Sequence, residues 1–170
     1  MPEQPFRHDQ QQEPAHRDAS SRFIWPPTIF SLACIAAYVL SRNTNVTLYP
    51  VDGTAVLRPA GWLLVAVAIV VAVWAEIAFL IAGTATLPIS PTSRIVTTGI
   101  YARTRNPMYL GMSLFTAGLA LVLNSLWFLI ALPLAVYAVT KLAIEPEENY
   151  LERKFGAEYL AYKSKVRRWL

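Results

Sequence analysis

Four apolar segments, covering residues 23–40, 61–82, 107–123 and 126–144, dominate the sequence. A helix rises about 1.5 Å per residue, so segments of this length are suited to cross a hydrocarbon layer of about 30 Å. The 170-residue chain is 55% hydrophobic and only 15% charged, which is too apolar for a typical soluble domain of this size. We therefore predict an all-α integral membrane protein with four transmembrane helices.

The connection between the third and fourth segments consists only of Asn124 and Ser125. So short a link predicts that these two helices form a tight antiparallel hairpin. Gly118 would ease the contact between them, and Pro133 is expected to kink the fourth helix.

The polar stretches between the apolar segments differ in character. Residues 1–22 are rich in Gln, Pro and charges without apolar periodicity, which predicts a disordered cytoplasmic tail, leaving 23–170 as the membrane domain. Residues 41–60 contain two short apolar runs on either side of Asp52-Gly53. This pattern favours a β-hairpin that covers the membrane domain from outside.

The segment after Ile144 is charged but keeps an apolar face with one member every three or four residues. The members of this face are Leu151, Phe155, Tyr159, Tyr162 and Val166. Several lysines and arginines follow, which predicts one amphipathic helix on the anionic cytoplasmic surface of the membrane.

The distribution of positive charge predicts the topology. Of the 15 Lys and Arg residues, 13 lie in the tail, in the loop 83–106 or from Lys141 onward, and only Arg42 and Arg58 lie elsewhere. By the positive-inside rule, both termini and the loop 83–106 lie in the cytoplasm, in a multi-pass inner or plasma membrane. The basic residues form no continuous tract, so we predict no nucleic-acid partner.

The stretch Gly99–Gly111 joins a polar turn directly to the third apolar segment. Pro107 suits the first helical position and Asn106 the N-cap, which places Arg103 and Arg105 at the mouth of the helix. Free amides, the helix dipole and guanidinium groups together favour a carboxylate or phosphate there. The alternative is an interfacial loop whose arginines follow membrane topology and whose tyrosines anchor at the level of the lipid headgroups.

Acidic residues reach the same membrane face after the fourth segment: Glu145, Glu147 and Glu148. A basic helix mouth opposite carboxylates suits a zwitterionic ligand, whereas the alternative is a surface helix of mixed charge. Glu76, inside the second segment, is either functional or snorkels to the interface. The single cysteine, Cys34, lies in an apolar segment, and we predict no metal site.

The run Val96–Gly111, followed by Glu147–Gly156 and by the pair Tyr159 and Tyr162, resembles the isoprenylcysteine carboxyl methyltransferase and phospholipid methyltransferase-like membrane family. The resemblance covers about the C-terminal half and includes both parts of the Arg-His-Pro-x-Tyr-x-Gly plus Glu-Glu signature. One position departs, because Asn106 stands where the family has histidine.

This resemblance implies S-adenosylmethionine as cofactor and a lipidic or membrane-embedded small acceptor within the bilayer. It implies catalytic roles for Arg105, Glu147 and Glu148. With the residues of the opening motif, the candidate cofactor-binding set is Gly99, Tyr101, Arg105, Asn106, Pro107, Tyr109, Gly111, Glu147 and Glu148. Two alternatives stay open: an NADPH-dependent membrane reductase of related fold, and a non-enzymatic membrane scaffold.

Overall fold

The computed structural model describes residues 26–83 and 94–170. The predicted tail, the first residues of the first apolar segment and part of the loop 83–106 lie outside these ranges. The described residues form helices and no strands. The α-helices are α1 (Pro26–Asn43), α2 (Thr54–Ala82), α3 (Pro107–Val122), α4 (Leu126–Val139), α5 (Glu145–Phe155) and α6 (Ala157–Lys165). Short 3-10 helices η2 (Val51–Gly53) and η3 (Gly99–Ala102) and a π-helical segment η4 (Thr140–Ile144) complete the set. This confirms the all-helical prediction.

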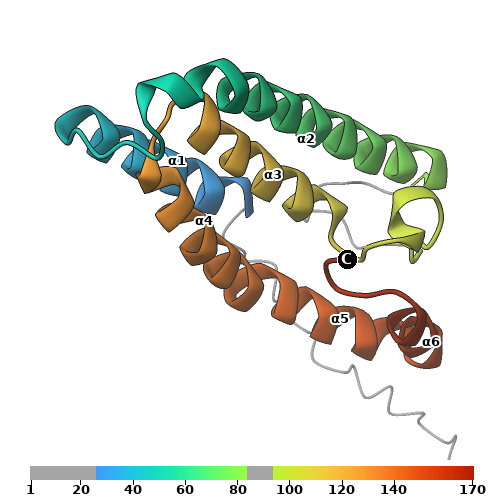
Figure 1. The fold of residues 1–170 in the computed structure, drawn as a ribbon. Helices are drawn as coiled ribbons and strands as arrows, with labels where there is room; N and C mark the ends of the chain where they lie inside the picture. Colours follow the sequence, from blue (N-terminus) through green and yellow to red (C-terminus); the bar gives the residue numbers. More distant parts are fainter. Residues whose placement is uncertain (1–25, 84–93) are drawn as a thin grey trace, which may run out of the picture.

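The helices pack in two closely associated pairs. Helix α3 lies along α2, and α1 packs on α4, while α3 and α4 also contact each other (Figure 1). Helix α4 continues through Pro133 and through η4 directly into α5, so that residues 126–155 form one long helix. Helix α6 then turns back toward the start of α3.

Two helical stretches of the described chain are long and apolar enough to cross a membrane, Val51–Ala82 and Leu126–Phe155. The apolar helix Pro107–Val122 is shorter. Large apolar side chains on the outer faces are exposed, as expected for surfaces in contact with lipid. Examples are Leu32, Leu63, Val70, Leu80 and Leu134. Four membrane crossings and a transmembrane hairpin remain predictions.

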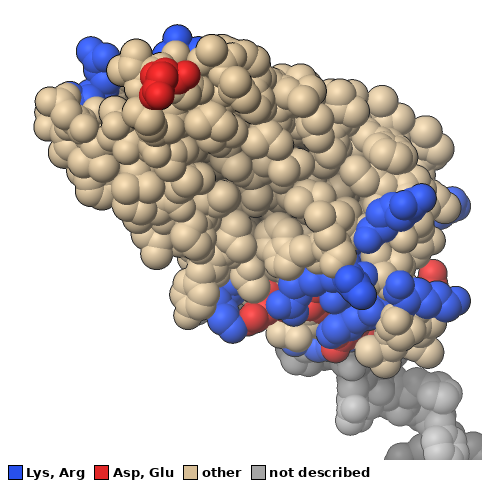
Figure 2. Space-filling view, viewed as in Figure 1, with Lys and Arg blue, Asp and Glu red and all other residues tan. Residues whose placement is uncertain are grey.

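Charged side chains gather at the two ends of the visible face, and a wide band without charges separates them (Figure 2). At one end, the last turn of α1 supplies Arg42, η2 supplies Asp52 and the beginning of α2 supplies Arg58. The basic and acidic residues of α5 and α6 belong to the other end. This separation fits a protein with an apolar belt and two polar surfaces.

Two glycines set the close approach of α2 and α3. A Cβ atom on Gly118 would lie 2.8 Å from Val65 Cγ2 and 2.9 Å from the carbonyl oxygen of Gly61. A Cβ atom on Gly61 would in turn meet Leu121 Cβ at 2.8 Å. The expectation that Gly118 eases contact between α3 and α4 is therefore wrong, because this glycine faces α2. Small residues at such crossings let two backbones approach closely.

The predicted β-hairpin in residues 41–60 is also wrong. Val51–Gly53 form a 3-10 turn, and Thr54 begins α2, because the apolar residues that follow continue the helical face. The backbone before the turn docks on the α3–α4 connection instead. The Asn124 side chain accepts hydrogen bonds from the backbone amides of Leu48 and Tyr49 at 3.0 and 2.9 Å.

The amphipathic segment after Ile144 is not one helix, as predicted, but two. Gly156 lies between α5 and α6 with φ 52° and ψ −123°, a conformation that residues with a Cβ avoid. The break redirects α6, so Tyr159 and Val166 are buried against protein rather than aligned along a membrane surface.

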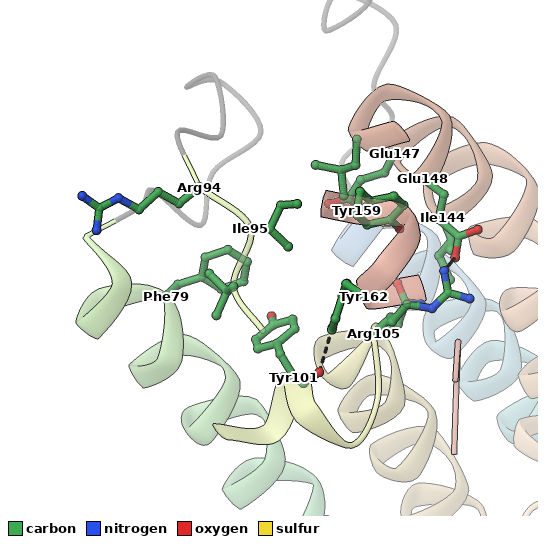
Figure 3. A pocket seen from close by; sticks show the side chains of 13 residues that line it. Phe79, Arg94, Ile95, Tyr101, Arg105, Ile144, Glu147, Glu148, Tyr159 and Tyr162 are labelled. Carbon is green, nitrogen blue, oxygen red and sulfur yellow. Dashed lines mark hydrogen bonds and ion pairs between the residues drawn. The ribbon is translucent and has the colours of Figure 1, made fainter. Parts of the chain in front are cut away.

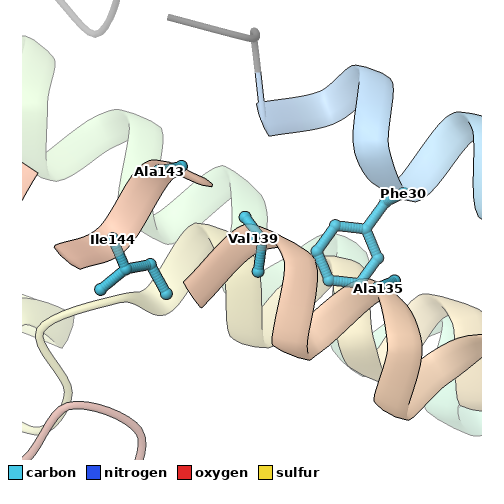
Figure 4. Close-up of a cluster of buried hydrophobic side chains, with 5 residues drawn as sticks. All are labelled: Phe30, Ala135, Val139, Ala143 and Ile144. Carbon is cyan, nitrogen blue, oxygen red and sulfur yellow. The ribbon is translucent and has the colours of Figure 1, made fainter. Parts of the chain in front are cut away.

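A buried apolar cluster joins α1 to α4 and η4 (Figure 4). Its members are Phe30, Ala135, Val139, Ala143 and Ile144, and Tyr109, Met112 and Trp169 are among the side chains that pack around it. The cluster therefore connects the membrane helices with the start of α3 and with the terminal residues.

We expect Gly118→Val to lower the free energy of unfolding by about 1–3 kcal/mol, because the added atoms overlap Val65 and the backbone of α2. Thermal unfolding in detergent measures this loss. Ala36→Val on the exposed face of α1 is the control and should change little. Equal losses in both variants would contradict a tight α2–α3 crossing.

Reporter fusions provide the test of topology. We expect fusions at both termini to report the cytoplasm and fusions within Arg42–Ala60 to report the opposite side, because of the distribution of basic residues. An odd number of crossings would contradict this arrangement.

Candidate functional site

A cavity of about 80 Å³ opens where the end of α2, η3, the residues before α3, α5 and α6 meet (Figure 3). It combines charged and aromatic side chains with a few aliphatic ones. Its lining residues are Phe79, Arg94, Ile95, Val96, Tyr101, Arg105, Asn106, Ile144, Glu147, Glu148, Leu151, Tyr159 and Tyr162. Two segments distant in sequence, the Gly99–Gly111 motif and the acidic start of α5, therefore share one cavity.

Residues 166–170, which we call the strap, run past the residues before α3. The amide of Arg105 donates to the Arg167 carbonyl at 3.0 Å, and the Asn106 side-chain amide donates to the Arg168 carbonyl at 3.0 Å. The Thr104 hydroxyl donates to the same carbonyl at 3.2 Å. Three consecutive residues of the motif thus hold two consecutive residues of the strap.

Glu148 is the buried charge of the site, with 5% of its surface exposed. Arg168 binds its carboxylate through two parallel hydrogen bonds, Nε to Oε1 at 3.1 Å and Nη2 to Oε2 at 2.7 Å. Arg105 Nη1 lies 3.0 Å from Oε1. This hydrogen-bonded carboxylate raises the pKa of Arg168, so that guanidinium remains charged.

Arg105 keeps unused hydrogen-bonding capacity. Its side chain is only 10% exposed, and neither Nε nor Nη1 has a hydrogen-bond acceptor among the described residues. The contact of Nη1 with Glu148 is close enough for an ion pair but does not meet hydrogen-bond geometry. A buried donor without an acceptor is costly, so an anionic group in the cavity would stabilise this arginine.

Aromatic residues form the other wall. The rings of Phe79 and Tyr101 pack edge to face, with centroids 5.1 Å apart. The Tyr162 hydroxyl donates to the Tyr101 carbonyl at 2.7 Å, which ties α6 to η3. Burial raises the pKa of both phenols, so they stay neutral near pH 7. This wall is therefore apolar apart from neutral hydroxyl groups, and Arg105 lines the same cavity.

Five of the predicted cofactor-binding residues line the cavity: Tyr101, Arg105, Asn106, Glu147 and Glu148. Glu148 is buried, whereas Glu147 is exposed at the rim. Asn106 occupies the N-cap of α3 as predicted, but its side chain makes no capping bond and donates to the strap instead.

The other four predicted residues support the site from nearby. Gly99 adopts φ 63° at the start of η3, and Pro107 begins α3. Tyr109 packs against the cluster around Phe30. Gly111 faces α2, where an added Cβ would lie 3.2 Å from the Ala68 carbonyl oxygen. None of the four is among the lining residues, and a cofactor role for them stays a prediction.

Sequence reasoning missed Arg168, which it assigned to a basic membrane-facing helix. Phe79 and Ile95 were also missed, because an apolar residue at a helix end carries no distinctive signal. Val166, which the apolar periodicity placed on the face of one continuous helix, is instead buried beyond the end of α6, where the strap folds back. Glu76 lines neither this cavity nor the groove described next.

A second, apolar groove of about 320 Å³ lies between α1, α2 and α3. Its lining includes Phe30, Cys34, Ala72, Met112 and Phe115. The Thr116 hydroxyl donates within its own helix to the Met112 carbonyl at 2.9 Å, which leaves the groove surface largely apolar. Its location among the apolar helices suits a hydrocarbon chain.

Fold and site together define a helical protein with membrane-type apolar helices and a charged cavity at one polar end. Sequence comparison identifies the family: residues 57–158, more than half of the chain, match the phospholipid methyltransferase family model. This chain belongs to the phospholipid methyltransferase family.

Two relatives illustrate the relationship. An uncharacterised protein of Haemophilus influenzae is 40% identical over 63 residues, which are 37% of this chain and all of that protein. Protein-S-isoprenylcysteine O-methyltransferase of Saccharomyces cerevisiae is 36% identical over 72 residues, which are 42% of this chain but 30% of the yeast enzyme. No solved structure matches the chain significantly. The family and the yeast relative point to a membrane methyltransferase.

Proposed function

We propose that the protein transfers a methyl group from S-adenosylmethionine to a lipidic or membrane-embedded small acceptor. The observation that carries the proposal is the Arg105 side chain, which has two buried nitrogens without hydrogen-bond acceptors and lines a cavity formed mostly by residues of the family-matched region. A carboxylate is the natural partner of such a guanidinium group, and the methionine part of the cofactor has one.

The remaining lining residues suit the rest of such a ligand. Phe79 and Tyr101 offer aromatic surface for a flat ring system, and Glu147 places a carboxylate at the rim for an ammonium group. The cavity of about 80 Å³ is smaller than typical ligand sites, so we expect α6 and the strap to open when the ligand enters.

S-adenosylmethionine supplies an electrophilic methyl group, whose bond to sulfur breaks as the bond to the acceptor forms. The protein residues need to align the two partners and to exclude water, because positive charge only disperses during such a displacement. A carboxylate acceptor needs no base. For an amine or thiol, Glu147 is the better base, because Glu148 is already held by two arginines.

We place the acceptor in the groove between α1, α2 and α3. Its apolar lining matches a hydrocarbon chain, and exposing each methylene to water costs about 0.8 kcal/mol, which favours entry directly from the bilayer. The polar cofactor would enter from the cytoplasmic side. The two reactants would then approach the start of α3 from opposite directions.

We expect Arg105→Ala to weaken S-adenosylmethionine binding at least tenfold, about 1.4 kcal/mol, because it removes the guanidinium group that would bind the carboxylate. Glu148→Ala should cause a loss of similar size, because Glu148 holds both Arg105 and Arg168 beside the cavity. Calorimetry with protein in detergent measures the affinity. Arg103→Ala is the matched control, since Arg103 belongs to the same motif but is exposed.

The same titrations separate the alternatives. A reductase would bind NADPH instead of S-adenosylmethionine, and a non-enzymatic scaffold would bind neither. Parental affinity in both Arg105→Ala and Glu148→Ala would show that the cofactor lies elsewhere.

Removal of residues 156–170 is expected to abolish S-adenosylmethionine binding without preventing membrane insertion, because α6 provides Tyr159 and Tyr162 to the cavity while the apolar helices remain. Membrane fractionation measures insertion, and calorimetry measures binding. A truncated protein with parental affinity would mean that α6 and the strap serve only as an anchor, and the enclosed-site mechanism would be rejected.

A further inference from the structure

We infer that Arg168 is a positioning residue that keeps Arg105 available for an anionic ligand. Arg168 lies beyond residues 57–158, the range of the family match. The inference rests on the proposed function, since the ligand is the carboxylate of S-adenosylmethionine, and it assigns to the strap a role in building the site.

The first step is the balance of charge around Glu148. Arg105 and Arg168, whose side chains are 10% and 34% exposed, both contact this single carboxylate, so the two guanidinium groups carry one more charge than the carboxylate neutralises. Lys163 is 4.0 Å from Glu148 Oε2 but forms its closer ion pair with Glu152. A surplus positive charge at 10% exposure favours binding of a further anion.

The second step is the unequal sharing of the carboxylate. Arg168 engages both oxygens, with contacts of 3.1 and 2.7 Å, in the bidentate arrangement that guanidinium and carboxylate groups prefer. The Arg105 contact to Oε1 does not meet hydrogen-bond geometry, and the other side-chain partner of Arg105 is the neutral Tyr159 hydroxyl. Without Arg168, Glu148 would be free to accept the Arg105 donors fully, and Arg105 would be less available to a ligand.

The third step is how Arg168 reaches Glu148. Its carbonyl accepts hydrogen bonds from Thr104 and Asn106, and the neighbouring Arg167 carbonyl accepts one from Arg105. Trp169 packs against the cluster that contains Ile144. The motif therefore holds the backbone of the strap in place. The strap in turn positions Arg168, whose guanidinium group binds the Glu148 carboxylate. This gives Asn106 a specific role as an anchor of the strap.

The test compares two neighbouring arginines of the strap. Arg168→Ala should weaken S-adenosylmethionine binding about tenfold in calorimetry, because Glu148 then captures Arg105. Arg167→Ala removes the same charge, but Arg167 is exposed and its side chain donates to the Leu170 carbonyl rather than to Glu148, so affinity should stay within about threefold of the parent. Arg168→Lys should fall between, since an ammonium group does not form the bidentate pair.

A double-mutant cycle shows whether Arg168 acts through Glu148. In a Glu148→Gln background, Arg168→Ala should change the affinity less than about threefold, because the neutral amide no longer competes strongly for Arg105. A general structural role would instead produce the same loss in both backgrounds. Thermal unfolding identifies variants that do not fold. If Arg168→Ala or a Glu148 variant does not fold, the affinity of Arg168→Lys compared with Arg167→Ala decides instead.

The outcomes separate the two proposals. A parent protein that binds no S-adenosylmethionine overturns the proposed function and this inference with it. A parent that binds, with Arg168→Ala and Arg168→Lys indistinguishable from Arg167→Ala, overturns the inference alone. Equal effects of Arg168→Ala with and without Glu148 also overturn it.

Discussion

The polar end of the molecule depends on one buried carboxylate. Glu148 is 5% exposed, and a charge at that depth is tolerated only when it is paired and hydrogen-bonded. Its partners come from the residue before the α3 N-cap and from the strap, which are 43 and 20 positions away in sequence. Formation of this cluster therefore brings together α5, the start of α3 and the strap, and it encloses the cavity as a consequence.

The membrane-type helices need a different kind of contact. Lipid is as apolar as a leucine side chain, so burial of apolar surface provides little force between helices in a bilayer, and close packing of small residues takes its place. Gly61 and Gly118 serve this purpose between α2 and α3. Because α3 begins at Pro107, directly after Arg105 and Asn106, the packing of α3 against α2 also determines where these two residues lie. The glycine contact and the charge cluster thus position the two ends of the same helix.

The sequence predicted the features that depend on local pattern. Apolar length and composition predicted the helices, and the Asn-Pro pair predicted the start of α3, because proline needs no amide hydrogen at the first helical position. The meeting of Arg105 with Glu148 followed from the motif and its resemblance. The break at Gly156 was not predicted, because an apolar periodicity of three to four residues continues across it and only the backbone angle reveals it. The role of Arg168 was missed for the same reason: a basic residue near other basic residues looks like a membrane-facing surface until the direction of the strap is known.

The departure at Asn106 is best understood together with the strap. A histidine in the family pattern offers a ring with one donor and one acceptor when neutral, whereas an amide offers two donors on one nitrogen and an oxygen. In this chain that nitrogen donates to the Arg168 carbonyl, which the Thr104 hydroxyl also reaches. The side chain is therefore directed to the backbone of the strap and not to the end of α3, where it makes no capping bond. Asn106 lines the cavity, so it joins the cavity wall to the segment that carries the arginine bound to Glu148. A substitution at this position would then change the charge cluster through the strap, even though Asn106 carries no charge and its side chain donates to the Arg168 carbonyl rather than to Glu148.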